Sequence, residues 1–348
     1  MSNPFKYLTV YSLPITAAMS FAMHGIFTFA PVILAFIIIP SLELVFKPDA
    51  SNLSETELDK VSTNKLYDWF IYLIFPIQWL ALLWFLFAVQ EVGLSAGETI
   101  GRISAYGMLC GVLGINVAHE LGHRAKRQEK ILAKGLLLSA LYLQFYIEHN
   151  KGHHKNVATP EDPTSARIGE WLSAFWLRSI VNVYVNAWKI SNKECKRKYG
   201  KTLSWKNEMI VYQAIEVVLV LTILILFGIK VMLFYLLAAF IGALLLETVE
   251  YIEHYGLSRT KVNEFRYENT SPKHSWNSNH TVGRLFLFEL SRHSDHHYKA
   301  YKKYPTLNNH QESPQMPTGY PGMMLLAAIP PLWFKIMNPK VKAFSEQA

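Results

Sequence analysis

Six long apolar runs constrain the fold of this chain more than any other feature of its sequence. They cover about 8–24, 26–46, 67–91, 99–118, 209–229 and 231–252, and each is close to the roughly 20 residues that a helix needs to cross a membrane. Charged residues make up only 17% of the 348 residues, whereas a soluble domain typically has about 25%. No Gly-, Ser- or Pro-rich linker divides the chain. We therefore predict a single all-α integral membrane domain over residues 1–348, with six transmembrane helices.

The distribution of lysine and arginine predicts how these helices are oriented. Sixteen basic residues lie in 124–208 and twelve in 255–348, which is 28 of the 34 in the chain. By the positive-inside rule both segments, taken as 119–208 and 253–348, are cytoplasmic. The opposite face then has only the short links near His24, 91–98 and 228–230, and both termini are cytoplasmic. In so apolar a chain, the net charge of +8 indicates basic loops facing anionic lipid rather than nucleic acid.

Two further segments have a helical pattern but are not expected to cross the membrane. Segment 131–147 is interrupted by Lys134 and Gln144, and a crossing there would place the following basic stretch on the wrong side. We predict a re-entrant or surface-lying helix pair. Segment 171–199 mixes aromatic and basic residues, which is typical of an amphipathic helix in the membrane interface. Residues 1–6 lack the features of a cleaved signal peptide, so we expect the first span to be retained.

Nine of the thirteen histidines fall in four short clusters, two at the ends of predicted spans and two in the segments outside the spans. Residues 119–123 read H-E-L-G-H, 148–154 read E-H-N-K-G-H-H, 251–256 read Y-I-E-H-Y-G and 292–297 read R-H-S-D-H-H. Histidines four residues apart share one helix face and can direct both rings at one ion. All nine lie on the cytoplasmic side that lysine and arginine predict. They are His119, His123, His149, His153, His154, His254, His293, His296 and His297.

The number of clustered histidines predicts a site for two metal ions. Nine ligands exceed the coordination sphere of one ion and fit two ions with four or five ligands each, which leaves open positions for dioxygen. Imidazole binds iron, copper and zinc, so the ligands alone do not identify the metal. Four carboxylates stand beside cluster histidines, and we expect each to accept the second N–H of a histidine from another segment. They are Glu120, Glu148, Glu253 and Asp295.

Other interpretations of these residues explain less of the sequence. H-E-x-x-H alone suggests a zinc protease with Glu120 as base, but seven clustered histidines would then have no role. A metal transporter would have histidines spread through the spans at bilayer depth. Cys110 and Cys195 are too few for a disulfide framework, a zinc ribbon or an iron–sulfur centre. Four histidines lack the paired spacing, and we expect them to be hydrogen-bonded anchors: His24, His274, His280 and His310.

From His119 to Leu307 the sequence resembles the membrane-bound alkane 1-monooxygenase (AlkB-type) family, within the wider group of histidine-rich membrane desaturases and hydroxylases. Residues 119–123 are similar to the first histidine box of the family. Residues 148–167 are similar to its second box and the stretch behind it, 251–257 to its E-H-Y-G-L element, and 292–298 with 305–307 to its last box. Two positions depart from the family pattern: Glu250 replaces the usual Asn, and Ser291 the usual Gln.

The resemblance implies a non-haem diiron centre on nine histidines, in a cytoplasmic cap on six helices of the bacterial inner membrane. It also implies that dioxygen is used to hydroxylate the terminal methyl of medium- or long-chain n-alkanes to primary alcohols. Electrons would come from NAD(P)H through rubredoxin reductase and rubredoxin. A chain with two cysteines and no G-x-G-x-x-G fingerprint needs such an external carrier, and 124–134 with 299–303 would be its basic docking face.

An alkane has no polar group, so we expect an apolar passage that opens between the spans toward membrane lipid and ends beneath the metals. Related reactions remain open at this point. A xylene-type monooxygenase acts on aryl methyl groups, and a fatty-acyl or sterol desaturase or hydroxylase uses similar histidine boxes on a polar-headed substrate. The E-H-Y-G element at 253–256 favours hydroxylation of hydrocarbons over desaturation, but it does not separate alkyl from aryl methyl groups.

Overall fold

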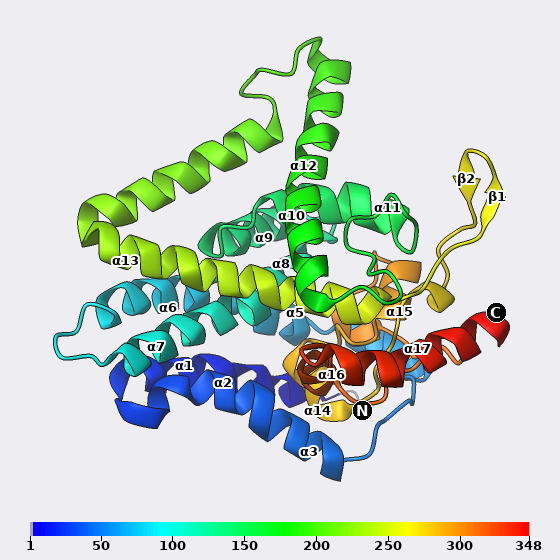
Figure 1. The fold of residues 1–348 in the computed structure, drawn as a ribbon, viewed down its shortest axis with the longest axis horizontal. Coiled ribbons are helices and arrows are strands. Elements are labelled where there is room, and N and C mark those ends of the chain that lie inside the picture. The colour runs from blue at the N-terminus through cyan, green and yellow to red at the C-terminus, as the bar shows by residue number, and fades with distance from the viewer. Residues whose placement is uncertain (1–2, 348) are drawn as a thin grey trace.

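The computed structural model describes residues 3–347, and it has the helical architecture that the sequence predicts (Figure 1). The strands found in this range are β1 (Lys261–Asn263) and β2 (Arg266–Tyr267), which form a small antiparallel hairpin. Four helical segments are long and apolar enough to cross a membrane: Gly25–Val45, Leu66–Ala88, Ala96–Gly122 and Glu208–His254. The protein is therefore all-α in class and has the features of a membrane protein.

Three of these segments are composites of shorter helices. The first consists of η2 (Gly25–Phe29), α2 (Ala30–Ile33), the π turn η3 (Leu34–Ile38) and α3 (Ile39–Val45). The second consists of α5 (Leu66–Tyr72) and α6 (Ile74–Ala88). The third consists of α7 (Ala96–Leu109), the π turn η4 (Cys110–Ile115) and α8 (Asn116–Gly122). The widened turn η3 ends just before Pro40, which has no N–H to donate and would crowd the preceding turn of an ideal α-helix.

The fourth segment, α13 (Glu208–His254), bends sharply at Gly228. This residue has φ +82° and ψ 171°, a conformation that only glycine adopts without a steric cost. Figure 1 shows the two halves of α13 running in different directions from this bend. The predicted spans 209–229 and 231–252 both lie within α13. The predicted span 8–24 corresponds to η1 (Pro4–Tyr11) and α1 (Ser12–Ala22), which are shorter than the four candidate spans.

The tight links between helices gather at one end of the molecule. His24, between α1 and η2, lies 3.1 Å from Glu91 and 3.3 Å from Glu98, which belong to the loop between α6 and α7 and to the start of α7. The capping box of Ser95 and Glu98 begins α7, since the two side chains satisfy free N–H groups of the first turn. In Figure 1 these links and the bend of α13 all lie on the left.

Helices α9 (Arg127–Ser139) and α10 (Gln144–Glu148) lie where the sequence predicts a helix pair. After α8, helix α9 turns back and packs against α8 and α6. The carbonyl of Ser139 at its end accepts hydrogen bonds from the hydroxyls of Tyr106 and Tyr235, both fully buried. Tyr106 lies 13 residues before His119, or about 20 Å along a helix. The pair therefore re-enters the helical bundle, and side chains satisfy its buried backbone carbonyl, as apolar surroundings require.

Helix α12 (Leu172–Tyr199) confirms the amphipathic prediction for 171–199. Its buried residues recur every three or four positions, for example Phe175, Ser179, Val183 and Ala187. In Figure 1 it runs across the direction of the other long helices. It ends at Gly200, whose φ of +75° closes the last turn in the left-handed conformation common after helix C-termini.

The remaining elements lie between these helices or follow α13. They are α4 (Glu55–Thr63), η6 (Pro272–His274), α14 (Thr281–Phe286), α15 (His293–Tyr298), η7 (Tyr304–Thr306), α16 (Tyr320–Ala327) and α17 (Pro330–Gln347). A hydrophobic core that includes Tyr251, Trp276, Tyr320 and Trp333 packs α16 and α17 against the end of α13. This core covers the end of the bundle that is opposite the tight links.

Candidate metal centre

Five helical elements lie close together and bring the nine clustered histidines into one site. His119 lies in α8, His254 ends α13, and α15 contains the last three. His149 and His153 belong to the π turn η5 (His149–His153), and His154 begins α11 (His154–Asn156). A π turn bonds residue i to i+5 and often marks a functional site. It therefore aligns His149 with His154, and their Nε2 atoms lie 3.0 Å apart.

One group contains five histidines: His119, His123, His149, His154 and His296. The Nε2 atom of His296 lies 2.8 Å from that of His119 and 3.1 Å from that of His154. The Nε2 atom of His123 is buried and has no hydrogen-bond partner within the described residues 3–347. A ring nitrogen that faces other ring nitrogens without a shared proton is typical of a metal ligand.

The other group contains four histidines: His153, His254, His293 and His297. The Nε2 atom of His297 lies 2.8 Å from that of His293 and 3.1 Å from that of His153. The Nε2 atoms of His293 and His254 are 3.3 Å apart. The structure thus brings together all nine histidines that the sequence singles out and divides them five and four.

The spacing of these nitrogens fits two metal ions. Two ligands about 2.1 Å from one ion and at right angles to each other lie about 3.0 Å apart, and the measured separations run from 2.8 to 3.3 Å. The donor set is all imidazole, which suits iron, copper or zinc. The residues present therefore fit a pair of transition-metal ions.

Burial keeps most of these rings neutral, which leaves a lone pair for a metal. Burial and the nearby His153 lower the pKa of His123 to about 3. Burial and neighbouring histidines lower the pKa well below its usual value in His149, His154, His293, His296 and His297. His153 differs: burial would lower its pKa, but the carboxylates of Asp162 and Glu250 outweigh this effect and raise it.

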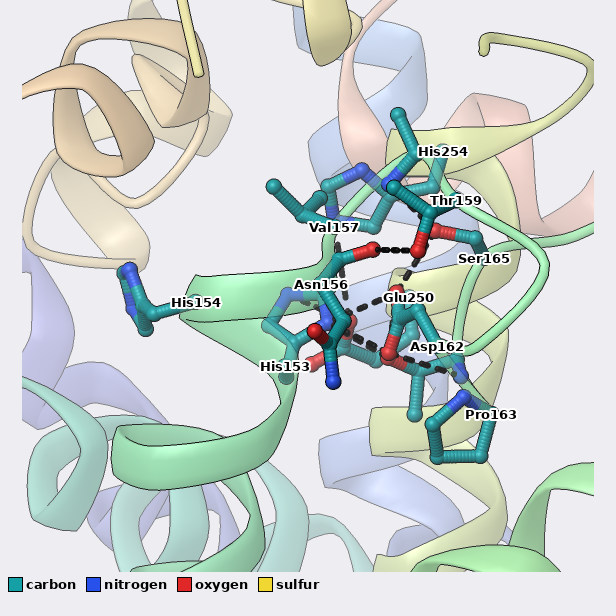
Figure 2. Close-up of polar contacts among 12 residues, drawn as sticks. His153, His154, Asn156, Val157, Thr159, Asp162, Pro163, Ser165, Glu250 and His254 are labelled. Atoms are coloured by element: carbon teal, nitrogen blue, oxygen red, sulfur yellow. Dashed lines mark hydrogen bonds and ion pairs between the residues drawn. The ribbon is translucent and has the colours of Figure 1, made fainter. Parts of the chain in front are cut away.

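Asp162 faces a clustered histidine, a contact that sequence reasoning missed. Its carboxylate lies 3.0 Å from Nδ1 of His153, and the Thr164 hydroxyl lies 2.7 Å from the same nitrogen. Figure 2 shows Asp162 and Glu250 directed toward His153 from different elements. A carboxylate at Nδ1 fixes the tautomer that presents Nε2 to a metal. Asp162 lies in a loop with no histidine beside it, so the spacing of the sequence contains no signal for this contact.

Glu253 faces a histidine of another segment, as expected, but the expected hydrogen bond from its Nδ1 is not found, because this buried atom of His293 has no hydrogen-bond partner among the described residues. The Oε1 atom of Glu253 lies 3.3 Å from Nδ1 of His293 and accepts a hydrogen bond of 2.6 Å from the Tyr320 hydroxyl. Burial and the charge of Glu253 raise the pKa of Tyr320 well above its usual value, so this hydroxyl remains a donor. Tyr320 was not predicted, because its link to the site spans 67 residues of sequence.

The other three expected carboxylates have different partners. Glu120 accepts hydrogen bonds from Arg124, one helical turn later. Glu148 accepts one from Asn186 of α12. Asp295 contacts His310, Lys302 and the backbone N–H of Asn308, and none of these is a cluster histidine. On a helix the residue next to a ligand points about 100° away from it, and in these three cases other polar side chains lie in that direction.

The four isolated histidines are hydrogen-bonded away from the two groups. His274 contacts Ser271, His280 contacts Ser278, and His310 contacts Asp295. His24 contacts acidic residues at the opposite end of the molecule.

An apolar cavity leads toward the histidines. Its walls come from α1, the helices of Gly25–Val45 and Ala96–Gly122, α13, α14 and α16. A smaller space directly beside His119, His149 and His293 has four lining residues in common with it. These shared residues are Asn116, Leu246, Val249 and Leu290. The cavity therefore ends beside residues of both histidine groups: His119 and His149 of the first and His293 of the second.

The basic side chains predicted to form a docking face are only partly exposed and available to a partner. Arg124 is buried and forms ion pairs with Glu120, Asp68 and Glu129, so it has a structural role. Lys126 and Arg127 are exposed.

Comparisons with known proteins place this chain among histidine-rich membrane enzymes. A family model for fatty acid desaturases matches residues 99–326, a range that contains all nine clustered histidines. Alkane 1-monooxygenase 2 of Alcanivorax borkumensis is 38% identical over 312 residues, which cover 89% of this chain and 81% of that protein. Alkane 1-monooxygenase 1 of Pseudomonas aeruginosa is 38% identical over 349 residues, 99% of this chain and 88% of that protein. The xylene/toluene monooxygenase hydroxylase component XylM of Pseudomonas putida is 28% identical over 257 residues, 72% of this chain and 66% of that protein.

Proposed function

Because the chain belongs to the fatty acid desaturase family and, within it, to the alkane 1-monooxygenases, we propose that it hydroxylates the terminal methyl group of medium- or long-chain n-alkanes. The product is the primary alcohol. One atom of dioxygen enters the alcohol, and the other leaves as water with two electrons and two protons. The observation that carries this proposal is the pair of histidine groups at the inner end of an apolar cavity.

The nine histidines would hold two iron ions, five ligands on one and four on the other. When bound, these ions supply the redox chemistry that activates dioxygen for insertion into a C–H bond. The protein's contribution is to hold each ring in place: Asp162 orients His153, and Glu253 with Tyr320 orients His293. The mostly neutral rings present lone pairs at neutral pH, so little proton release accompanies metal loading.

The cavity favours a substrate without a polar group. Asn116 and Tyr320 are its polar lining side chains, and both already donate hydrogen bonds, to the Leu287 carbonyl and to Glu253. A fatty-acyl headgroup would find few polar partners there and would lose hydration with little compensation. A hydrocarbon gains about 0.8 kcal/mol per methylene on leaving water but little on leaving lipid. The walls therefore serve mainly to direct the terminal methyl toward the histidines.

Electrons must reach the site from another protein. Cys110 and Cys195 are buried, and the sequence has no dinucleotide fingerprint. We assign the carrier role to rubredoxin, reduced by rubredoxin reductase, and the exposed Lys126 and Arg127 would help to attract this acidic partner.

The chain would lie in the bacterial inner membrane with both termini and the histidines on the cytoplasmic side. Six crossings result if the two halves of α13 on either side of Gly228 each span the bilayer and η1 with α1 forms another span. The exposed apolar side chains of α13, such as Ile225 (79% exposed) and Leu226 (68%), support contact with lipid. The whole chain, 1–348, then forms one membrane-embedded domain.

Product analysis tests this function. The purified chain, loaded with iron and supplied with dioxygen, NAD(P)H, rubredoxin reductase and rubredoxin, is given octane, hexadecane, xylene and a fatty acid. We expect 1-octanol or 1-hexadecanol as the main product, identified by gas chromatography with mass spectrometry. Oxidation of xylene alone would move the assignment to aryl methyl groups, and a desaturated or hydroxylated fatty acid alone would contradict it.

A further inference from the structure

The carboxylate of Glu250 lies inside the metal centre rather than behind it. Glu250 is in α13, one turn before His254, and is 3% exposed. Its Oε2 atom lies 3.5 Å from Nε2 of His153 and 3.7 Å from Nε2 of His254. These are the nitrogens that face the other rings of the four-histidine group. Glu250 also lines the small space between His119, His149 and His293.

The hydrogen bonding of Glu250 differs from that of its neighbours on the same helix. Glu247 accepts hydrogen bonds from the hydroxyls of Tyr142 and Ser179, and Glu253 accepts one from Tyr320. The Oε2 atom of Glu250 is buried without a hydrogen-bond partner among the described residues. A buried carboxylate oxygen is costly unless a donor or a cation compensates its charge. A cation bound between the ring nitrogens would supply that compensation.

We propose that Glu250 is an oxygen ligand of the metal ion held by His153, His254, His293 and His297. This inference rests on the metal loading put forward under the proposed function. It gives each ion five protein ligands: five imidazoles in one case, and four imidazoles with one carboxylate in the other. The two ions then differ in charge, because a carboxylate neutralises one positive charge and imidazole neutralises none. The ion beside Glu250 is the one more readily oxidised.

The sequence at this position departs from the family pattern. Residue 250 is a position where the family pattern usually has Asn, and an amide does not supply the anionic oxygen that Glu250 provides. Asp162 and Glu253 each face an Nδ1 atom, whereas the Oε2 atom of Glu250 faces two Nε2 atoms. The Oε1 atom of Glu250 lies 3.8 Å from Nδ1 of His149, so the Oε2 atom is the one placed as the oxygen of a metal ligand would be.

The test compares Glu250→Gln with Glu247→Gln, a control on the same helix with a carboxylate of similar burial that lies away from both groups. Each full-length protein is loaded with ⁵⁷Fe(II) and challenged with a chelator, and the iron retained per chain is counted. Mössbauer spectra recorded before the challenge report on each ion separately. For Glu250→Gln we expect one of two ions to be released at least about tenfold faster and one quadrupole doublet to change. For Glu247→Gln we expect both ions and both doublets to stay as in the wild type.

Two ions retained by Glu250→Gln at the wild-type rate, with unchanged doublets, would overturn the proposal. If Glu250→Gln does not fold, Glu250→Asp replaces it. That variant keeps the charge but moves the oxygen away by one methylene, so one doublet should still shift, and unchanged doublets would again refute the ligand. Wild-type protein that does not bind two iron ions would count against the proposed function itself. The two failures are thus distinguishable.

Discussion

Replacing Tyr320 with Phe removes a single hydroxyl from the junction of the cavity and the metal centre. The Tyr320 ring lines the apolar cavity, and its hydroxyl donates a 2.6 Å hydrogen bond to Glu253, which lies 3.3 Å from Nδ1 of His293. Phe keeps the ring and therefore the shape of the cavity. The variant should change how firmly His293 is held and leave the substrate-binding surface almost intact.

The expected magnitude follows from the type of hydrogen bond that is lost. A bond from a neutral donor to a charged carboxylate contributes about 1.5–3 kcal/mol, and 1.36 kcal/mol corresponds to a factor of ten. If this energy serves to orient His293, the variant should bind the ion of the four-histidine group about tenfold to a hundredfold more weakly. This range agrees with the usual effect of removing a group that supports a metal-binding histidine. The turnover number should fall with metal occupancy, while the KM for alkane stays close to the wild-type value.

A chelator competition at equilibrium measures the affinity, and octane turnover at saturating iron measures the catalytic effect. Tyr304→Phe is the matched control, because the Tyr304 hydroxyl is also buried but donates to the backbone carbonyl of Tyr67. Equal metal affinity and equal turnover in Tyr320→Phe, Tyr304→Phe and the wild type would refute the reasoning.

Three further changes test other parts of the account. Asp162→Asn removes the charged acceptor at His153, and iron affinity in a chelator competition should fall about tenfold to a hundredfold; unchanged affinity would contradict that role. Val112→Trp fills the cavity, and kcat/KM for octane should fall about tenfold or more with iron content unchanged; normal turnover would exclude this cavity as the substrate path. Glu289→Gln breaks the buried pair with Arg284 and should cost about 3–5 kcal/mol near pH 7. Although burial opposes it, nearby cations including Arg284 hold the pKa of Glu289 below its usual value of 4.5. The ion pair therefore stabilises the fold fully above about pH 4.5 and progressively less as the pH falls. The difference in thermal midpoint between Glu289→Gln and the wild type should accordingly become smaller in acid. A difference that does not change with pH would refute this prediction.

The parts of the site that could be predicted are those set by local helical geometry. His119 with His123 and His293 with His297 are pairs four residues apart, and each pair faces one histidine group, as the spacing predicts. His149 and His153 have the same spacing but belong to different groups, because the π turn η5 aligns His149 with His154 instead. The apolar runs and the amphipathic pattern of α12 are likewise local properties. Their agreement with the structure follows from the fact that helices, once formed, leave their side chains little choice of direction.

The parts that could not be predicted depend on contacts between distant segments. Tyr320 reaches Glu253 across 67 residues, and Asp162 reaches His153 from an irregular loop. Neither contact has a periodicity that a sequence would reveal. For Glu120 the sequence did contain the signal, but the prediction chose the wrong partner. The spacing leads us to expect a histidine partner, whereas the structure pairs Glu120 with Arg124, only four residues later.

The metal content of active protein tests the central claim most directly. The chain is purified in detergent, its octane hydroxylation is measured, and its metals are counted by mass spectrometry. We predict that activity rises with iron and reaches its maximum at two iron ions per chain. Full activity with one ion, or with zinc in place of iron, would contradict the assignment of the two histidine groups.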